Sequence, residues 1–336
     1  MTISVPKVKK YHKWKVGQIN IQSCSDDLKL DFALQECCRA NLEVVCFQEV
    51  RRLNSGSLQH CGYNFYWNGL KRFRRHGVGI AIKECSYISV DNIINCSGRL
   101  MAADILVKGC KIRVISAYAP TLQTALSTKQ TFYRELTKLC KTENNRKVLI
   151  QGDFNMEMPI CRRHSCFEGS RSYFEEGTNQ ENENAMLFVS FCHNTKLSIL
   201  NTWYDHPLHH RVTWHHPDGT SKKVYDYSLS HSWLRQFVND VRVRNSYFTS
   251  DHRLVVTSLK TPANKAARTF RRLKTKPRPN FELLQDDTVL SNTCNEIEKY
   301  LLENPTPTEI QDIHTHMIQA LQNGKKKYLN KLKLNK

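Results

Sequence analysis

The stretch Val148-Leu149-Ile150-Gln151-Gly152-Asp153-Phe154-Asn155 runs from three apolar residues directly into a polar loop. This is the pattern of a buried strand that ends in a functional turn, and α/β proteins collect their site residues at such strand ends. Carboxylates, amides and one imidazole gathered at one end of a sheet are typical of metal-assisted attack on a phosphodiester. Other polar groups also follow or close short apolar runs, namely Asn20, Glu49, Asp226 and the pair Asp251-His252.

The composition favours a folded protein with a polyanionic partner. The chain has 336 residues, of which 40% are hydrophobic and 10% aromatic, so it has a packed core and is not disordered. The net charge is +19, and a surplus of this size favours binding to phosphate groups. Residues 260–336 contribute +7, which leaves +12 for residues 1–259, so the tail alone does not account for it. We therefore expect a polyanionic partner that contacts residues 1–259 as well as the tail.

The cysteine pattern and the hydropathy of the sequence predict where in the cell the protein is located. Thirteen cysteines are an odd number without regular spacing, the chain opens on polar and basic residues, and no apolar run approaches the ~20 residues of a membrane helix. We expect reduced thiols, a nuclear or cytoplasmic location, and no membrane partner.

Strand and helix patterns alternate over the first 260 residues. Helical spacing covers 28–40, 128–140 and 185–193, and Lys108-Gly109-Cys110 is predicted to form a hairpin turn. Mixed order with hairpins predicts an α/β protein whose sheets pack face to face, and not a doubly wound sheet. Strands are predicted at 15–22, 44–49, 77–82, 101–107, 111–117, 147–150, 197–200, 211–214, 224–230, 240–243 and 254–259.

The composition changes after Lys260. Residues 261–280 hold three prolines and seven basic residues and are predicted to be a linker. We expect four segments: a basic N-terminal tail at 1–13, a catalytic domain at 14–260, the linker at 261–280, and a helical basic extension at 281–336.

Ten short segments follow one another in consistent order between Trp14 and Lys260. They are QIN at 18–20, CFQEVRR at 46–52, GVGIAI at 77–82, ISAYAPT at 115–121, QGDFN at 151–155, NENA at 182–185, LNTWY at 200–204, TWHHPDG at 213–219, YDY at 225–227 and SDH at 250–252. Together they resemble the endonuclease/exonuclease/phosphatase superfamily, and in particular the endonuclease domain of LINE-type (non-LTR, RTE-like) retrotransposons. The resemblance implies a four-layer α/β/β/α sandwich of two mixed sheets and metal-dependent hydrolysis of phosphodiesters.

Glu49 is predicted to bind the metal, which we expect to be Mg²⁺ or Mn²⁺. It ends an apolar strand, and Mg²⁺ is bound by one or two carboxylates with retained waters. A glutamate in this place can instead cap a helix. Asp251 is predicted to be a second ligand or an outer carboxylate. Gln22 stands where related apurinic endonucleases have an acidic or amide residue. Because the residue here is an amide, no second carboxylate ligand comes from the first strand.

The Gly-Asp-Phe-Asn stretch is predicted to position water and phosphate. Asp153 would orient or deprotonate the attacking water, while Asn155 and Asn20 would donate to phosphate oxygens. Taken alone, such a stretch is more often a turn closed by an Asx hydrogen bond. The other matching segments favour the catalytic interpretation.

His252 is predicted to lie against the scissile phosphate. Asp226 would hold its ring and raise its basicity, as in a catalytic triad. Tyr118 would donate its phenol toward phosphate, and the alternative is a half-buried structural tyrosine.

Three further residues are predicted to contact DNA. Thr213 and Trp214, with the turn Pro217-Asp218-Gly219, resemble the DNA-contacting loop of retrotransposon endonucleases. Asn184 is either a phosphate contact or the N-cap of a helix.

These residues together predict a retrotransposon-derived endonuclease that nicks DNA and leaves a 3′-hydroxyl. In related elements that end primes a reverse transcriptase, a domain this sequence does not contain. One alternative is a superfamily phosphoesterase for RNA, inositol phosphate or lipid. Another is a non-catalytic, domesticated DNA-binding protein.

Overall fold

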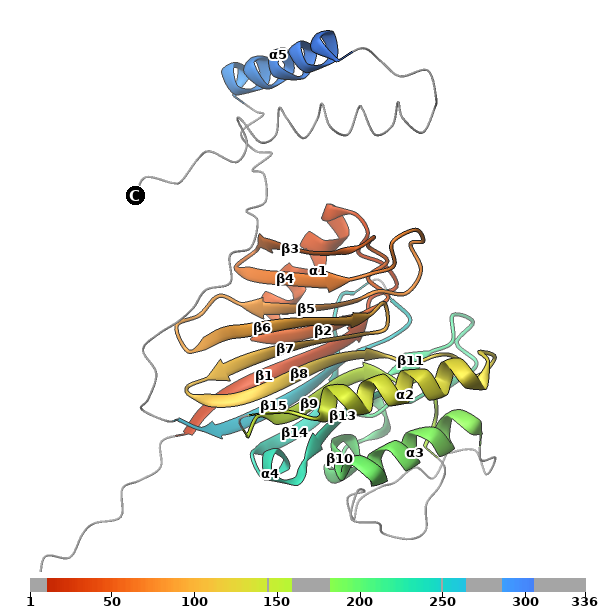
Figure 1. The fold of residues 1–336 in the computed structure, drawn as a ribbon. Helices are drawn as coiled ribbons and strands as arrows, with labels where there is room; N and C mark the ends of the chain where they lie inside the picture. Colours follow the sequence, from red (N-terminus) through yellow and green to blue (C-terminus); the bar gives the residue numbers. More distant parts are fainter. Residues whose placement is uncertain (1–10, 144, 159–181, 249, 264–285, 305–336) are drawn as a thin grey trace, which may run out of the picture. The chain divides into compact units, whose positions relative to one another are not determined.

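The computed structural model describes residues 11–143, 145–158, 182–248, 250–263 and 286–304 (Figure 1). The chain divides into two compact units, Met1–Thr275 and Lys276–Lys336. The first unit contains both large sheets. The second contains helix α5 (Asp287–Glu303), whose N-cap Asp286 accepts hydrogen bonds from the backbone of Thr288 and Val289.

The first sheet has seven strands in the order β14-β15-β1-β2-β5-β4-β3. Strand β1 runs parallel to β2, with Asn20 beside Gln48, and antiparallel to β15, with Gln18 opposite Val255. The ends of β1 and β2 therefore meet at one edge of the sheet. The strand bounds are β1 (Tyr11–Asn20), β2 (Val44–Gln48), β3 (Ser55–His60), β4 (Tyr63–Asn68), β5 (Val78–Lys83), β14 (Val238–Arg244) and β15 (Leu254–Pro262).

The second sheet has six strands in the order β10-β13-β9-β8-β7-β6. Strand β9 runs parallel to β8, with Asp153 beside Tyr118, and antiparallel to β13, with Asp153 opposite Asp226. Three polar side chains thus share one edge of this sheet as well. The strand bounds are β6 (Ile88–Ser97), β7 (Leu100–Val107), β8 (Cys110–Tyr118), β9 (Lys147–Asp153), β10 (Leu197–Ile199) and β13 (Asp226–His231).

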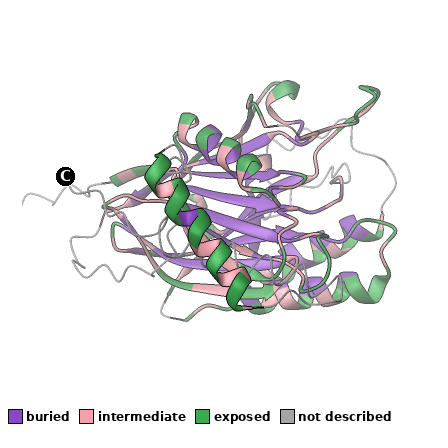
Figure 2. Ribbon diagram, turned by 90° about the horizontal axis from the view of Figure 1, so that it is seen from above, coloured by how far each residue is buried: buried purple, intermediate pink, exposed green. Residues whose placement is uncertain are grey.

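The helices form the outer layers. Helix α1 (Asp27–Arg39) packs on the outer face of the first sheet, and α2 (Leu126–Cys140) and α3 (Glu183–Thr195) pack on that of the second (Figure 1). Buried strands lie between helices whose outer sides are exposed (Figure 2). This confirms the predicted four-layer sandwich. The short elements are the 3₁₀ turns η1 (Leu200–Trp203) and η2 (Leu208–His210), the helix α4 (Ser232–Arg235), and the small hairpin of β11 (Trp214–His215) and β12 (Lys222–Lys223).

The two-residue periodicity of the strands builds these layers. In β2, Val44 and Cys46 belong to the core between the two sheets, whereas Val45 and Phe47 belong to the core under α1. All four are fully buried, as expected of a central strand covered on both faces. Asp26 caps α1 by accepting a hydrogen bond from the backbone N–H of Lys29 at 2.8 Å.

Three strands of the two large sheets and the two-residue strand β12 escaped the prediction from sequence. Strand β3 contains a single large apolar residue, Leu58, and all residues of β6 but one are half-buried or exposed, so neither gives a strong hydrophobic pattern. Strand β4 was missed as well. The first sheet is also longer than predicted, because β1 begins at Tyr11 and β15 continues to Pro262. Trp14 and Thr261, both buried, are joined by an indole-to-hydroxyl hydrogen bond of 3.2 Å.

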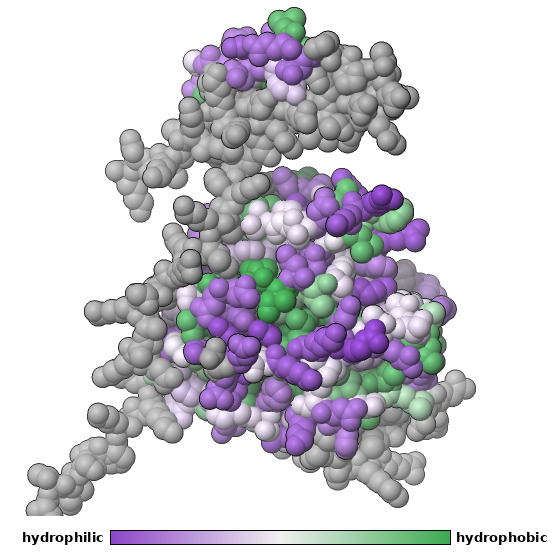
Figure 3. All heavy atoms as spheres, viewed as in Figure 1, coloured by the Kyte–Doolittle hydropathy of each residue, from purple (hydrophilic) through white to green (hydrophobic). Residues whose placement is uncertain are grey.

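Hydrophilic side chains predominate on the face of the first unit seen in Figure 3, and hydrophobic side chains show near its middle and toward its lower right. None of the helices in the described part of the chain has the length and hydropathy that a membrane crossing requires.

Candidate active site

Polar residues from both sheets meet at the edge where β1, β2, β8 and β9 end. Asn20 closes β1, and Glu49 directly follows β2. Asp153 and Tyr118 close β9 and β8, and Asp226 opens β13. His252 lies two residues before β15. The structure thus brings together the residues that the sequence predicts for the catalytic centre.

Asn20 connects the two sheets. Its side-chain nitrogen Nδ2 donates to Glu49 Oε1 and to Asp153 Oδ2, each at 3.0 Å. Its Oδ1 accepts from the backbone N–H of Gln22 at 3.1 Å, which fixes the orientation of the amide. Both amide protons are therefore used by carboxylates, and the predicted phosphate contact requires one of these hydrogen bonds to open.

Glu49 is a charged carboxylate held by three donors. Besides Asn20, Tyr118 Oη donates to Oε1 at 2.8 Å, and Arg51 Nη2 donates to Oε2 at 2.5 Å. Burial raises the pKa of Glu49, but the hydrogen bonds from Asn20, Arg51 and Tyr118 outweigh burial, and the net shift is downward. Glu49 also has a left-handed backbone, with φ of 53°, which non-glycine residues rarely adopt and which is frequent at functional sites.

Asp153 is buried beside another carboxylate. Burial raises its pKa, the positive charge of His252 lowers it, and the negative charge of Asp226 raises it, with a net upward shift. A carboxylate whose pKa is raised toward neutrality is suited to accept a proton from water. Gly152 permits this position, because a Cβ there would lie 2.6 Å from the carbonyl oxygen of Ala117 on the neighbouring strand.

His252 is a buried cation surrounded by carboxylates. Its Nδ1 lies 2.9 Å from Asp226 Oδ2, and its Nε2 lies 3.8 Å from Asp153 Oδ2 and 3.9 Å from Asp251 Oδ1. Burial lowers the pKa of His252, but the charges of Asp226 and Asp153 and the hydrogen bond to Asp226 raise it well above its usual value. The Asp226–His252 pairing is the predicted one.

Gln18 and Arg99 were missed by the sequence prediction. Gln18 Nε2 donates to Asp226 Oδ1 at 2.5 Å, so it holds the carboxylate that holds His252. Arg99 donates to the backbone oxygen of Tyr118 at 3.3 Å and stacks its guanidinium over that ring. Gln18 could have been found, because it lies two residues before Asn20 and so faces the same side of β1.

The carboxylates fit a hard divalent cation. Asp251 Oδ2 accepts from Trp214 Nε1 at 3.0 Å, while its Oδ1 is buried without a hydrogen-bond partner among the described residues. An orphaned carboxylate oxygen and the charged Glu49 are the kind of oxygen ligand that Mg²⁺ takes. Donor atoms of Asp153, Asp226 and His252 also lie within 4.8 Å of one another. His252 Nδ1 is engaged with Asp226 at 2.9 Å, so Nε2 is the ring nitrogen left to face a metal or a phosphate.

The side chains of Asn155 and Asn184 are engaged inside the protein. Asn155 Nδ2 donates to the backbone oxygen of Ala119 at 2.8 Å. Asn184 Nδ2 donates to the backbone oxygens of Pro120 and Asn155, each at 3.0 Å. These bonds shape the loops around Asp153. The N-cap of α3 is Asn182 and not Asn184, which corrects the capping alternative.

Thr213 is fully buried. Its hydroxyl accepts from the backbone N–H of Tyr225 at 3.0 Å and of Asp226 at 3.2 Å. A residue with no exposed surface cannot contact DNA, so the predicted contact is corrected to a role in positioning Asp226.

Trp214 lies at the rim of the site. It pairs with His252 in an isolated antiparallel bridge and is half-buried. The turn predicted at residues 217–219 is present, since Gly219 has φ of 77° and Thr220 N–H donates to Asp218 Oδ1 at 2.8 Å. Its place beside Asp251 makes Trp214 the predicted DNA contact that the geometry favours.

Comparisons with known proteins agree with this geometry. A family described as "Endonuclease-reverse transcriptase" matches residues 112–256. Craniofacial development protein 2 of Bos taurus is 28% identical over 251 residues, which are 73% of this chain and 40% of the relative. The chain thus spans about two fifths of the length of the curated relatives it matches.

Two solved structures share the fold. The endonuclease domain of TRAS1, a telomere-specific non-LTR retrotransposon, has a TM-score of 0.53 at 12% identity and covers 75% of this chain and 100% of that one. The AP endonuclease LMAP from Leishmania major has a TM-score of 0.57 at 15% identity, and the match covers 77% of this chain and 93% of that one. Residues 112–256 are thus similar to a family described as "Endonuclease-reverse transcriptase", and the chain shares its fold with the endonuclease domain of a non-LTR retrotransposon and with an AP endonuclease.

Proposed function

We propose that this chain is a Mg²⁺- or Mn²⁺-dependent endonuclease that hydrolyses one strand of DNA and leaves a 3′-hydroxyl. The observation that carries the proposal is the Asn20 amide shared by Glu49 and Asp153, beside the ion pair of His252 and Asp226. This arrangement places a metal-type carboxylate, a candidate base and a buried cation around one point.

Each side chain has a separate role in the proposed hydrolysis. Glu49 and Asp251 would hold the cation, which would supply positive charge beside the scissile phosphate. Asp153 accepts the proton of the attacking water, and its raised pKa suits that task. His252, protonated and held by Asp226, donates from Nε2 to a phosphate oxygen and stabilises the charge that builds up there. The water oxygen forms a bond to phosphorus as the bond from phosphorus to the 3′ oxygen breaks, and the leaving 3′ oxygen takes a proton from solvent to become the hydroxyl.

DNA is the favoured substrate for two reasons. Residues 1–259 carry a net charge of +12, which attracts a long polyanion more than a small phosphate ester. Trp214 at the rim offers an aromatic surface beside Asp251. We further propose that the chain derives from a retrotransposon and that the nick it makes can prime reverse transcription.

The test is relaxation of supercoiled plasmid by the purified full-length chain, with Mg²⁺, Mn²⁺ or excess chelator. The expected result is metal-dependent nicking, with nicks that a DNA polymerase extends without prior phosphatase treatment. Plasmid binding without nicking in either metal would indicate a non-catalytic DNA-binding protein. Hydrolysis of RNA, inositol phosphates or lipids in place of DNA would assign the site to a different phosphoesterase.

A further inference from the structure

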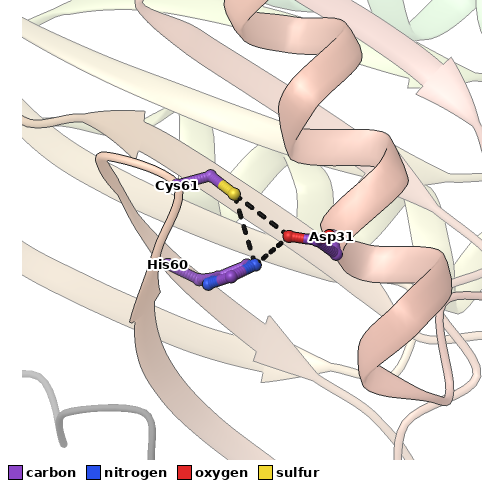
Figure 4. Close-up of side chains that lie close together, drawn as sticks. All are labelled: Asp31, His60 and Cys61. Carbon is purple, nitrogen blue, oxygen red and sulfur yellow. Dashed lines mark hydrogen bonds and ion pairs between the residues drawn. The ribbon is translucent and has the colours of Figure 1, made fainter. Parts of the chain in front are cut away.

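A second group of metal-ligand side chains lies outside the active site. Asp31 comes from α1, His60 closes β3, and Cys61 begins the turn to β4 (Figure 4). One donor atom of each residue lies within 4.8 Å of the other two. We refer to these three residues as the edge cluster, because β3 is the outermost strand of the first sheet.

The edge cluster and the active site lie at opposite ends of the sheet. At one end, Ser55 of β3 leads through Asn68 and Val78 to Gln48, next to Glu49. At the other end, His60 pairs with Tyr63, and Tyr63 pairs with Lys83. Five residues of extended strand separate these ends, or about 17 Å at roughly 3.3 Å per residue. The edge cluster is therefore a separate site.

The contacts favour a chelate over a catalytic triad. Cys61 Sγ lies 3.1 Å from Asp31 Oδ1 and 3.2 Å from His60 Nε2, and these two partners also contact each other. Figure 4 shows the three atoms pointing at one another. A triad uses the two ring nitrogens of its histidine for different partners. Here both partners share Nε2, which is the geometry of three ligands around one ion.

The surroundings orient the ligand atoms. Gln35 Nε2 donates to Asp31 Oδ2 at 3.0 Å, which directs Oδ1 toward the cluster and is the kind of outer contact that metal ligands have. Cys61 and Gly62 form a two-residue turn with φ of 48° and 72°. Such turns favour Asn-Gly, because both residues need a left-handed backbone. A cysteine there is unusual, and the turn places its sulfur beside His60.

We propose that Asp31, His60 and Cys61 bind one Zn²⁺ ion. One thiolate, one imidazole and one carboxylate are ligands that zinc accepts, whereas Mg²⁺ requires oxygen. Tetrahedral zinc bonds place neighbouring ligand atoms about 3.3–3.6 Å apart. The two contacts of Cys61 Sγ are close to this spacing, whereas His60 Nε2 and Asp31 Oδ1 lie closer together and must move apart to admit the ion. Cys61 binds as the thiolate and releases its proton to solvent. The half-buried site leaves the fourth position to water, and the ion ties α1 to the β3–β4 hairpin.

Cobalt substitution tests the proposal on the full-length protein. Co²⁺ bound by a thiolate gives a sulfur-to-cobalt charge-transfer band in the near ultraviolet, and a cation at the carboxylates of the active site gives none. We expect the band to saturate at about one cobalt per chain and to vanish on addition of Zn²⁺. Mg²⁺ bound at the active site also stabilises the fold, so the melting temperature is measured in saturating Mg²⁺, where we expect added Zn²⁺ to raise it further through the edge cluster.

The variants separate metal loss from misfolding. Cys61→Asn suits the left-handed turn, so it should fold and yet lose the band and the zinc-dependent rise in melting temperature. His60→Ala should lose both as well. Cys96→Ser is the matched control, since Cys96 is an exposed thiol on β6, and it should keep both. Absence of a band in the unmodified protein, or a band that survives in folded Cys61→Asn, overturns the proposal. Plasmid nicking is not needed for either measurement.

Discussion

Replacing Asp226 with asparagine is expected to remove the charge of His252 without changing the shape of the site. Asp226 lies between two partners, with Oδ1 2.5 Å from Gln18 Nε2 and Oδ2 2.9 Å from His252 Nδ1. The Gln18 amide can only donate at that nitrogen, so an asparagine must turn its oxygen toward Gln18. Its own NH₂ then faces His252 Nδ1, which is forced to accept. The ring becomes neutral, with its proton on Nε2.

The size of the effect follows from the role of the cation. Positioned proton donors and acceptors contribute ~10²–10⁴-fold, or about 3–5 kcal/mol at 1.36 kcal/mol per tenfold. Asp226→Asn and His252→Ala each remove the same imidazolium, so each should slow nicking by about this factor. The double mutant should be hardly slower than either single mutant, because the second change has nothing left to remove.

The assay is single-turnover nicking of supercoiled plasmid at saturating enzyme, with DNA affinity measured in parallel by fluorescence anisotropy. Affinity should change little in all three variants. Asp240→Asn is the matched control, because Asp240 pairs with His206 at 2.7 Å on edge strand β14, outside the active site. That variant should nick DNA at the normal rate. Thermal melting confirms that each variant is folded.

Two results would refute the reasoning. If the losses of the single mutants multiply in the double mutant, Asp226 does not act through His252. If Asp240→Asn slows nicking as much as Asp226→Asn, the effect is a general loss of structure. A loss of DNA affinity equal to the loss of rate would mean that the pair binds substrate and does not act on the bond that breaks.

Further outcomes follow from the same geometry. Glu49→Gln should abolish nicking while plasmid binding persists in gel shifts, and nicking that survives excess chelator would contradict the metal site. Asp153→Ala should slow single-turnover nicking by ~10²-fold or more with DNA affinity nearly unchanged. A chain ending at Lys260 lacks Thr261, the partner of Trp14, and should melt several degrees below one ending at residue 263. The latter should nick at low salt, with a shallower salt dependence of binding than the full chain.

Much of this fold can be predicted from the sequence, because its central strands are continuous hydrophobic segments. The strands before Glu49 and Asp153 are buried on both faces, and their continuous hydrophobicity marks where each functional residue follows. Strand β3 was missed because its residues are polar and it lies at the sheet edge, where a hydrophobic pattern is not required. The missed strand also concealed the edge cluster, since His60 and Cys61 approach Asp31 only through the β3–β4 hairpin.

Hydrogen-bond direction is the part of the site that the sequence could not supply. A polar residue beside a catalytic one can face the substrate or support its neighbour, and local pattern does not distinguish the two. Thr213 has the sequence context of a DNA contact, yet its hydroxyl accepts from the backbone of Asp226. The Asn155 amide likewise donates to the Ala119 carbonyl. Which role each takes depends on partners far away in the sequence, and those become known only with the fold.

Three of the strands that meet at the site become more polar toward the sheet edge along the face between the two sheets. Alternate residues pass from apolar, through an amide or hydroxyl, to the group at the sheet edge. The middle step forms a layer in which Gln48 donates to Ser116 and Gln151 donates to Ser228, across and within the sheets. The steps are Val16, Gln18 and Asn20 in β1, Val114, Ser116 and Tyr118 in β8, and Leu149, Gln151 and Asp153 in β9.

This layer explains how buried charges are held in place. Charged groups directly on a hydrocarbon core would be desolvated without compensation, whereas neutral amides offer hydrogen bonds without adding charge. The layer is not optimised for stability alone, since Oε1 of both Gln18 and Gln151 is buried without a partner among the described residues. The NH₂ group of Gln18 points in a fixed direction, toward Asp226. Its hydrogen bond orients the Asp226 carboxylate, which in turn orients His252. The interior of the sandwich therefore orients the pair that keeps His252 charged.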